Sequence, residues 1–187
     1  GTILTTPFTW IATASSIVWE GHTPKFVDVD PHTFNIDVTK IEASITSDTV
    51  AIVAVHVFSN PCDVEALETI SKKYNLPILY DAAHAFGVRT GNRSIFEWGD
   101  ISTVSFHATK VFNTAEGGGV FCNTTTLHER VRAIRDFGFN SNREIQLVGT
   151  NAKMSELHAA LGLANLPLVD TAIECRCRLT EQYQHTL

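Results

Sequence analysis

The segment Thr49-Val-Ala-Ile-Val-Ala-Val-His-Val-Phe58 is an apolar run rich in β-branched residues, without a regular polar alternation. Such a run is typical of a parallel strand that is covered on both faces. The turn Asn60-Pro-Cys-Asp63 follows, and Asp63 is placed to cap a helix that ends near Asn75. A second apolar run, Pro77-Ile-Leu-Tyr-Asp81, comes directly after this helix. The three segments together predict alternating strands and helices around a parallel sheet.

The same alternation continues in both directions along the chain. Asp37 is placed to cap a helix whose apolar residues Ile41 and Ile45 recur four positions apart. Further strands are expected at residues 25–30, 101–106 and 119–122, the last of them buried, and further helices at 7–19, 126–137, 155–166 and 169–183. The predicted fold class is α/β, with a mainly parallel sheet flanked by helices. Because residue 1 lies almost directly before a helix, with no strand on that side, we expect an interior piece of a longer protein.

Composition excludes several classes of protein. The chain has 187 residues, 44% of them hydrophobic, and a formal net charge of −6 without a basic stripe, so nucleic-acid binding is not expected. Residues 1–19 carry no charge, but seven of these residues are Ser or Thr and Pro7 interrupts the run, so a membrane span is not expected. The four cysteines have no redox or zinc-binding spacing and are interpreted as reduced thiols of a cytoplasmic protein.

Lys110 is a candidate nucleophile, because it lies just beyond the expected strand in the stretch Ser105-Phe-His-Ala-Thr-Lys110. Open α/β sheets bind ligands at the carboxyl ends of their strands. The glycines at 117–119 would let the backbone approach such a ligand closely. A lysine that is desolvated at this edge forms Schiff bases readily. The alternative interpretation is a solvated lysine in a surface loop.

Asp81 ends the strand expected at 77–81 and begins the stretch Asp-Ala-Ala-His-Ala-Phe-Gly87. A carboxylate at this position would keep a pyridinium nitrogen protonated. The alternative interpretation, an aspartate that caps a helix or stabilises a turn, is about equally frequent. Trp10 offers a flat face for a planar cofactor, or else a core contact. His84 and His56 are interpreted as histidines near the core. No metal site is predicted, since no pair of His, Asp or Glu has a convincing ligand spacing.

Taken together, these residues resemble the sugar-nucleotide aminotransferases of the DegT/DnrJ/EryC1/StrS family, which have the fold-type I fold of enzymes that use pyridoxal 5'-phosphate (PLP). The resemblance covers nearly the whole chain, in the family's order and spacing. Its blocks are Pro7-Phe-Thr-Trp-Ile-Ala-Thr13, Thr23-Pro-Lys-Phe-Val-Asp-Val-Asp30, Tyr80-Asp-Ala-Ala-His-Ala-Phe-Gly87, Ser105-Phe-His-Ala-Thr-Lys110 with Glu116-Gly-Gly118, and Asn151-Ala-Lys-Met-Ser-Glu-Leu-His-Ala-Ala160.

The resemblance implies a role for each matching position. Lys110 matches the lysine that holds PLP as an internal aldimine and moves a proton between the reacting carbons. Asp81 matches the acid that pairs with the pyridine nitrogen. Trp10 matches an aromatic residue that stacks on the cofactor ring, and His84 lies beside the ring's other polar edge. Ser105 matches a hydroxyl that binds the cofactor phosphate.

The implied reaction transfers an amino group from an amino acid, usually glutamate in this family, to a keto-sugar nucleotide for amino-sugar and surface polysaccharide biosynthesis. The resemblance also implies a homodimer, in which Lys153 reaches the phosphate of the neighbouring subunit. Two alternatives stay open. The first is a PLP-dependent sugar dehydratase, although that branch has histidine where this chain has Lys110. The second is a non-catalytic, shortened relative that dimerises or binds a ligand.

The sequence departs from the family in length, because family members are roughly twice as long. We therefore expect residues 1–166 to form a partial PLP-binding large domain, truncated at both ends. Residues 167–187 are expected to form a helix that leads towards a C-terminal small domain. The segment that cradles the cofactor phosphate in the family is expected to belong to the part of such a protein upstream of residue 1. This piece is accordingly expected to bind PLP weakly and to turn over slowly or not at all.

Overall fold

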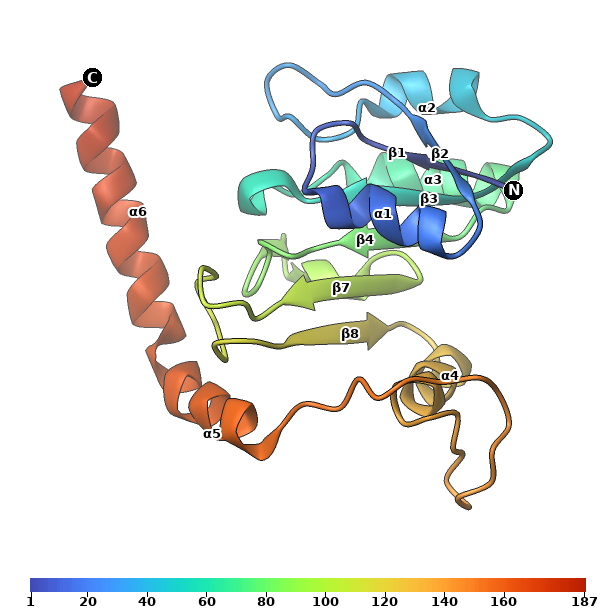
Figure 1. Cartoon of the computed structure of the whole chain (residues 1–187). Helices are drawn as coiled ribbons and strands as arrows, with labels where there is room; N and C mark the ends of the chain where they lie inside the picture. The colour runs from blue at the N-terminus through green and yellow to red at the C-terminus, as the bar shows by residue number, and fades with distance from the viewer.

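A computed structural model describes residues 1–187, and its centre is a six-stranded sheet in the order β2-β1-β3-β4-β7-β8 (Figure 1). The strands are β1 (Thr2–Thr5), β2 (Thr23–Phe26), β3 (Thr49–Val55), β4 (Ile78–Asp81), β7 (Ile101–Ser105) and β8 (Gly118–Cys122). All neighbouring strands pair in parallel except β7 and β8, which are antiparallel. The predicted α/β class with a mainly parallel sheet is confirmed.

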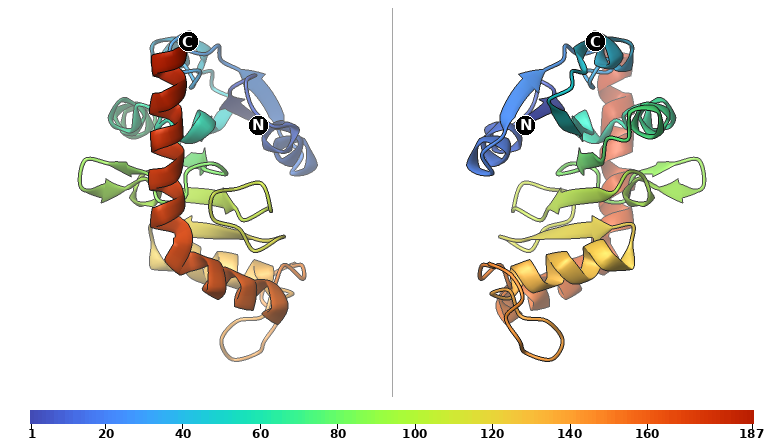
Figure 2. Two further views of the ribbon diagram at one scale, coloured as in Figure 1. Left: turned by 90° about the vertical axis from the view of Figure 1, so that its left-hand side faces the viewer. Right: turned by 90° about the vertical axis from the view of Figure 1, so that its right-hand side faces the viewer.

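Helices cover both faces of the sheet. In the views of Figure 2, α1 (Ile11–Trp19) lies on one side of the sheet and α3 (Val64–Tyr74) on the other. The remaining elements are α2 (Val38–Ser44), α4 (Thr125–Arg135), α5 (Glu156–Asn165), α6 (Val169–Thr186), the short helices at Val57–Ser59, Ile95–Glu97 and Leu166–Leu168, and a small hairpin of β5 (Arg89–Thr90) and β6 (Arg93–Ser94). None of the helices is both long and apolar enough to cross a bilayer.

The predicted N-caps of α2 and α3 are confirmed. The Asp37 side chain accepts a hydrogen bond from the Thr39 N–H at the start of α2, and the Asp63 side chain accepts one from the Ala66 N–H at the start of α3. These carboxylates satisfy amides that have no partner within their helices. At the other end of α3, Asn75 ends the helix in the left-handed conformation, with φ of 52°.

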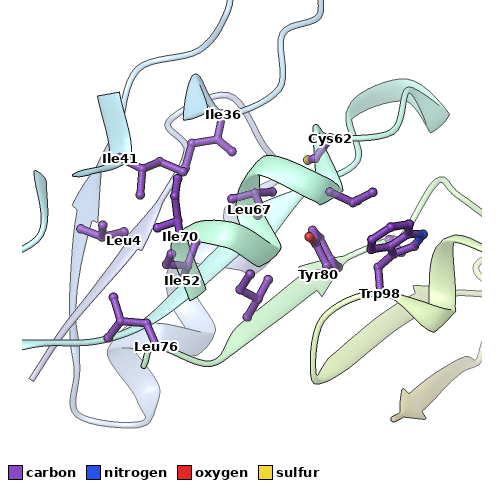
Figure 3. Packing of buried hydrophobic residues seen from close by; sticks show 14 of the residues in the cluster. Leu4, Ile36, Ile41, Ile52, Cys62, Leu67, Ile70, Leu76, Tyr80 and Trp98 are labelled. Carbon is purple, nitrogen blue, oxygen red and sulfur yellow. The ribbon is translucent and has the colours of Figure 1, made fainter. Parts of the chain in front are cut away.

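The main hydrophobic core lies between the sheet and the pair α2–α3 (Figure 3). Leu4 from β1 and Ile52 from β3 face Ile41 from α2 and Leu67 from α3, and all four side chains are completely buried. A Leu-to-Ala change at such a site costs about 2–5 kcal/mol of stability. Residues 49–55 of the β-branched run form β3 and are mostly buried between layers, whereas Val57 and Phe58 at its end belong to the short helix Val57–Ser59 instead of the predicted strand.

The sequence analysis missed a strand at the start of the chain. Residues Thr2–Thr5 form β1, which pairs in parallel with both β2 and β3 and so lies inside the sheet rather than at its edge. The segment is only four residues long, so its β-branched residues alone form too short a pattern to identify it. Its position follows from pairing with β3, and Leu4 is completely buried as a result.

The prediction that residues 119–122 form a buried strand was wrong about burial. β8 is the antiparallel strand at the edge of the sheet, and most of its residues are exposed or half-buried. The glycines there fit packing against β7 rather than access for a ligand. A Cβ atom on Gly118 would lie 2.8 Å from the Val104 carbonyl oxygen, and one on Gly119 would lie 3.2 Å from the Val104 side chain.

His56 follows β3 and is completely buried, with its ring stacked on Tyr80 at a centroid distance of 4.6 Å. Its Nδ1 accepts a hydrogen bond from the Cys62 N–H at 3.0 Å, whereas its Nε2 has no partner. Burial lowers the pKa of His56 from 6.5 to about 4. Since Nδ1 is an acceptor, the ring is neutral and carries its proton on Nε2.

Because the His56 ring is buried without a charge, we expect the free energy of unfolding to fall in mild acid. Between pH 6.5 and pH 4 the unfolded chain binds a proton at His56 and the folded chain does not, so stability falls as the pH falls. Through His56 alone, the free energy of unfolding is expected to fall by about 2 kcal/mol from pH 7 to pH 5. Denaturant unfolding at both pH values measures it, and His56→Phe, which keeps a flat ring but does not titrate, is expected to flatten the dependence. An equally steep dependence in both proteins would contradict this assignment.

Candidate active site

Two neighbouring strands bring candidate residues to the same edge of the sheet. Asp81 is the last residue of β4 and Ser105 the last residue of β7, and these strands pair in parallel with Asp81 opposite Thr103. The backbone of Asp81 is held from both sides, because its carbonyl accepts a hydrogen bond from the His56 N–H at 3.0 Å while Ala82 donates to the Thr103 carbonyl at 2.8 Å. This is the edge at which parallel sheets bind ligands.

A hollow of about 430 Å³ lies at this edge. It is lined by Phe58, Ser59, Ala83, His84, Phe86, Thr109, Lys110, Val111 and Arg176. In Figures 1 and 2, α6 runs past the ends of β4 and β7, which explains how Arg176, distant in sequence, comes to line the hollow. The lining contains the basic side chains of Lys110 and Arg176 and no carboxylate. The hollow is therefore electropositive and suited to an anionic ligand.

The chain after β3 forms one wall of the hollow in a strained conformation. Phe58 and Ser59 both have left-handed φ angles, of 52° and 70°, which are uncommon for residues other than glycine. The Ser59 hydroxyl donates a hydrogen bond to the His84 carbonyl, and the Phe58 ring lies parallel to the His84 imidazole at 6.2 Å. Local strain of this kind clusters at functional sites.

Lys110 lies in the turn that follows β7. Its backbone N–H donates to the His107 carbonyl at 2.9 Å, and its side chain is half-buried at the hollow. The salt bridges of the chain involve neither Lys110 nor Arg176. An amine at a cleft without a carboxylate partner is available to a ligand, as the interpretation of Lys110 as a nucleophile requires.

His84 lines the hollow together with Lys110 and follows Asp81 by three positions. Partial burial lowers the pKa of His84, the positive charge of Lys110 lowers it further, and the carboxylate of Asp81 acts in the opposite direction. His84 is therefore a neutral imidazole at neutral pH. Lys110 and Asp81, 29 positions apart in the sequence, therefore both lie near enough to His84 to affect the pKa of its ring.

The Asp81 carboxylate is fixed by hydrogen bonds to both of its oxygens. Oδ1 accepts from the Ala83 N–H at 3.1 Å, and Oδ2 accepts from the Thr13 hydroxyl of α1 at 2.6 Å. Sequence reasoning missed Thr13, because a threonine in the first turn of a helix gives no signal of contact with a strand end elsewhere. It also missed Arg176, which only the path of α6 brings to the hollow.

Trp10, Ser105 and Lys153 are the remaining candidates from the sequence, and none of them lines the hollow. Trp10 is the N-cap residue of α1, three positions before Thr13, and its side chain is 78% exposed rather than packed in the core. The Ser105 hydroxyl accepts a hydrogen bond from the His107 N–H at 3.3 Å, at the start of the Lys110 turn. Lys153 does not line the hollow. Its ammonium lies 3.3 Å from Asp136 Oδ1 and 2.6 Å from Asn151 Oδ1.

Comparison with known proteins identifies relatives of this chain. A model of the DegT/DnrJ/EryC1/StrS aminotransferase family matches residues 1–187. The dTDP-4-amino-4,6-dideoxy-D-glucose transaminase of Shigella dysenteriae is 46% identical over 187 residues, which cover 100% of this chain and 51% of the relative. The GDP-perosamine synthase of Caulobacter vibrioides is 36% identical over 187 residues, which cover 99% of this chain and 50% of the relative.

A solved structure shows the same fold. The crystal structure of DesI in the presence of its TDP-sugar product matches with a TM-score of 0.86 and 38% sequence identity, over 91% of this chain and 44% of that chain. The chain thus spans about half the length of the curated relatives that it matches.

Proposed function

The chain belongs to the DegT/DnrJ/EryC1/StrS aminotransferase family, and on this premise we propose that the protein transfers an amino group from an amino acid to a keto-sugar nucleotide with PLP as cofactor. The observation that carries the proposal is the cluster at the edge of the sheet. An unpaired Lys110 lines an electropositive hollow next to His84, within electrostatic reach of the anchored carboxylate of Asp81.

The residues present fit PLP chemically. Such a cofactor needs an amine for its aldehyde, an anionic partner for its ring nitrogen and flat neighbours for its ring. Lys110 supplies a free amine, and Asp81 supplies a carboxylate whose orientation is fixed. The parallel rings of Phe58 and His84 and the exposed indole of Trp10 supply flat surfaces. The volume of about 430 Å³ is within the usual range for small-molecule sites.

In the proposed reaction the protein residues orient the reactants and move protons. When bound, PLP supplies an electron-withdrawing ring that stabilises negative charge on the carbon from which a proton leaves. The Asp81 carboxylate accepts a hydrogen bond from the ring nitrogen and so keeps a proton on that atom. Lys110 Nζ takes up the proton from the donor carbon and later returns one to the product side. The Phe58 and His84 rings form part of the lining of the hollow.

The charge of the hollow supports anionic reactants. Amino-acid donors such as glutamate carry carboxylates, and sugar nucleotides carry a diphosphate. Arg176 presents a guanidinium that no carboxylate of the chain occupies, and such a group binds either kind of oxyanion through two parallel hydrogen bonds. The names of the two relatives described above refer to dTDP-4-amino-4,6-dideoxy-D-glucose and to GDP-perosamine, both of which are linked to a nucleotide. Glutamate as donor and a 4-keto sugar nucleotide as acceptor are therefore the pair to test first.

A labelled-nitrogen experiment tests this proposal. The purified chain is incubated with PLP, nitrogen-15-labelled glutamate and a dTDP-linked 4-keto-6-deoxyglucose, and the sugar nucleotide is analysed by mass spectrometry. Because slow turnover is expected of this chain, the product is measured after long incubation; it is expected to carry the labelled amine in place of the keto oxygen, with an equal amount of 2-oxoglutarate. Loss of water without gain of nitrogen would identify a dehydratase instead. Cofactor binding without any reaction would identify a non-catalytic relative.

Arg176→Gln tests whether Arg176 binds one of the two anionic reactants. We expect the KM for at least one of the two anionic reactants to rise roughly 10- to 100-fold, because a charge-assisted hydrogen bond is lost, with a smaller change in kcat. The matched control is Arg178→Gln, which removes an exposed arginine of the same helix that does not line the hollow. Equal KM values in the two variants would show that Arg176 does not bind a reactant.

We also propose a homodimer in the cytoplasm. One sheet face is covered mainly by α1, whose Ile11, Val18 and Trp19 are 69%, 57% and 87% exposed. Large apolar side chains gathered on one helix are typical of a face that a second subunit covers. Lys153 is proposed to reach the neighbouring subunit's cofactor phosphate, which requires it to leave Asp136. The four free cysteines support a reducing compartment.

A further inference from the structure

Thr13 makes the shortest side-chain contact to Asp81. Its hydroxyl lies 2.6 Å from Asp81 Oδ2, a distance typical of a hydrogen bond from a hydroxyl to a charged carboxylate. The side chain of Thr13 is 5% exposed, so water does not compete for this hydrogen bond. Thr13 belongs to the first turn of α1, and the contact spans 68 positions of the sequence. It is therefore a tertiary contact that ties α1 to the end of β4.

A second hydroxyl extends this contact. Thr9 Oγ1 lies 2.7 Å from Thr13 Oγ1. Each hydroxyl has one hydrogen to donate, and an ionised carboxylate only accepts. Because the hydrogen of Thr13 is directed to Asp81, Thr13 must accept from Thr9, so the donors run in order from Thr9 to Thr13 to Asp81. Hydrogen bonds aligned in this way polarise and strengthen one another.

The other carboxylate oxygen is held as well. The Ala83 N–H donates to Asp81 Oδ1 at 3.1 Å. With one fixed donor on each oxygen, the plane of the carboxylate is set by the backbone on one side and by α1 on the other. Each oxygen keeps a further lone pair that these two hydrogen bonds do not use. Without Thr13, a single hydrogen bond from Ala83 would leave the carboxylate free to rotate about its last torsion.

We propose that Thr13, supported by Thr9, is a positioning residue that holds the Asp81 carboxylate in the orientation needed by the ring nitrogen of the cofactor. The inference rests on the proposed function, because it assigns a purpose to the orientation of Asp81. Thr13 itself does not contact the reacting atoms in this assignment. Its contribution passes entirely through Asp81.

The test compares Thr13→Val with Thr13→Ser in the full chain. Valine has the shape of threonine without the hydroxyl, whereas serine keeps the hydroxyl and loses a methyl group. We expect the valine variant to weaken PLP binding, measured by absorbance titration, roughly 10- to 100-fold. We expect the serine variant to stay within about 3-fold of the wild type, because a hydrogen bond to a charged group outweighs one methyl here. Thr9→Val should give a smaller loss than Thr13→Val.

A matched control removes the same kind of contact elsewhere. The Thr39 hydroxyl donates to Asp37 Oδ1, also at 2.6 Å, at the start of α2 and away from the hollow. Thr39→Val should therefore leave PLP binding unchanged. Crystal structures of the valine and serine variants without cofactor provide a second readout. The Asp81 carboxylate is expected in more than one orientation in Thr13→Val and in one orientation in Thr13→Ser.

The outcomes separate this inference from the proposed function. If the wild-type chain gives no cofactor absorbance, the proposed function fails, and the crystal structures alone decide whether Thr13 orients Asp81. If the wild type binds PLP and Thr13→Val binds it equally well, with Asp81 in a single orientation, the inference is overturned. Equal losses in Thr13→Val and Thr13→Ser would also overturn it, since the hydroxyl would then not be the group that matters.

Discussion

Lys110→Ala is expected to reduce amino-group transfer by at least about 10³-fold, because it removes the amine that holds the cofactor and the base that moves the proton. The visible absorbance that arises when PLP is added to the wild-type chain should be absent in the variant. Alanine leaves a small gap in a half-buried turn, so the fold itself is expected to persist. Circular dichroism and a melting curve check that it does.

The control for this variant is Lys72→Ala. Lys72 lies on α3 with a side chain that is 73% exposed and paired with Glu68, so its loss removes a lysine without affecting the hollow. The expected result is wild-type activity and absorbance. If Lys110→Ala retains both the absorbance and amino transfer, Lys110 is not the cofactor lysine and the proposed site is wrong.

Asp81→Asn is expected to lower the transfer rate by about 10²- to 10³-fold, the usual cost of removing one electrostatic partner from an active site. The amide has the shape of the carboxylate and can still accept a hydrogen bond from Thr13. It carries no charge, however, and its N–H₂ group would donate to the ring nitrogen instead of keeping that nitrogen protonated. The effect should fall on kcat more than on KM, because the interaction matters most when negative charge develops.

Asp170→Asn is the control for the loss of one carboxylate. Asp170 lies in the first turn of α6, is exposed and does not line the hollow. Single-turnover spectra with glutamate compare the three proteins directly. An Asp81→Asn variant that reacts as fast as the control would remove Asp81 from the mechanism.

Much of the fold was predictable because its signals are local. Most residues of the strand part of the run, 49–55, are buried, and Asp37 and Asp63 cap helices through contacts within three positions. β1 was missed because four residues carry no periodicity and its place inside the sheet depends on β2 and β3. β8 was predicted to be buried because its residues are apolar, although an edge position leaves them partly exposed.

The candidate site was predictable only in part, because only some of its residues have a local signal in the sequence. Lys110 and Asp81 were found because each lies at or just beyond the carboxyl end of a strand, and parallel strands bring such ends together. Ser105 was identified only through the family resemblance, and the roles of all three residues stay predictions. Thr13 and Arg176 come from helices whose packing no short pattern specifies. The roles of Trp10, His84 and Lys153 came from family resemblance and stay predictions, with Lys153 engaged by Asp136 and Asn151 in this chain.

Covalent trapping tests the central claim, that Lys110 is the residue that binds the cofactor. The chain is mixed with PLP, reduced with borohydride to fix the cofactor carbon to the lysine nitrogen, digested and mapped by mass spectrometry. The account predicts one modified lysine, Lys110, with little labelling after Lys110→Ala. Modification spread over exposed lysines such as Lys72 and Lys153, or concentrated on a lysine other than Lys110, would contradict it.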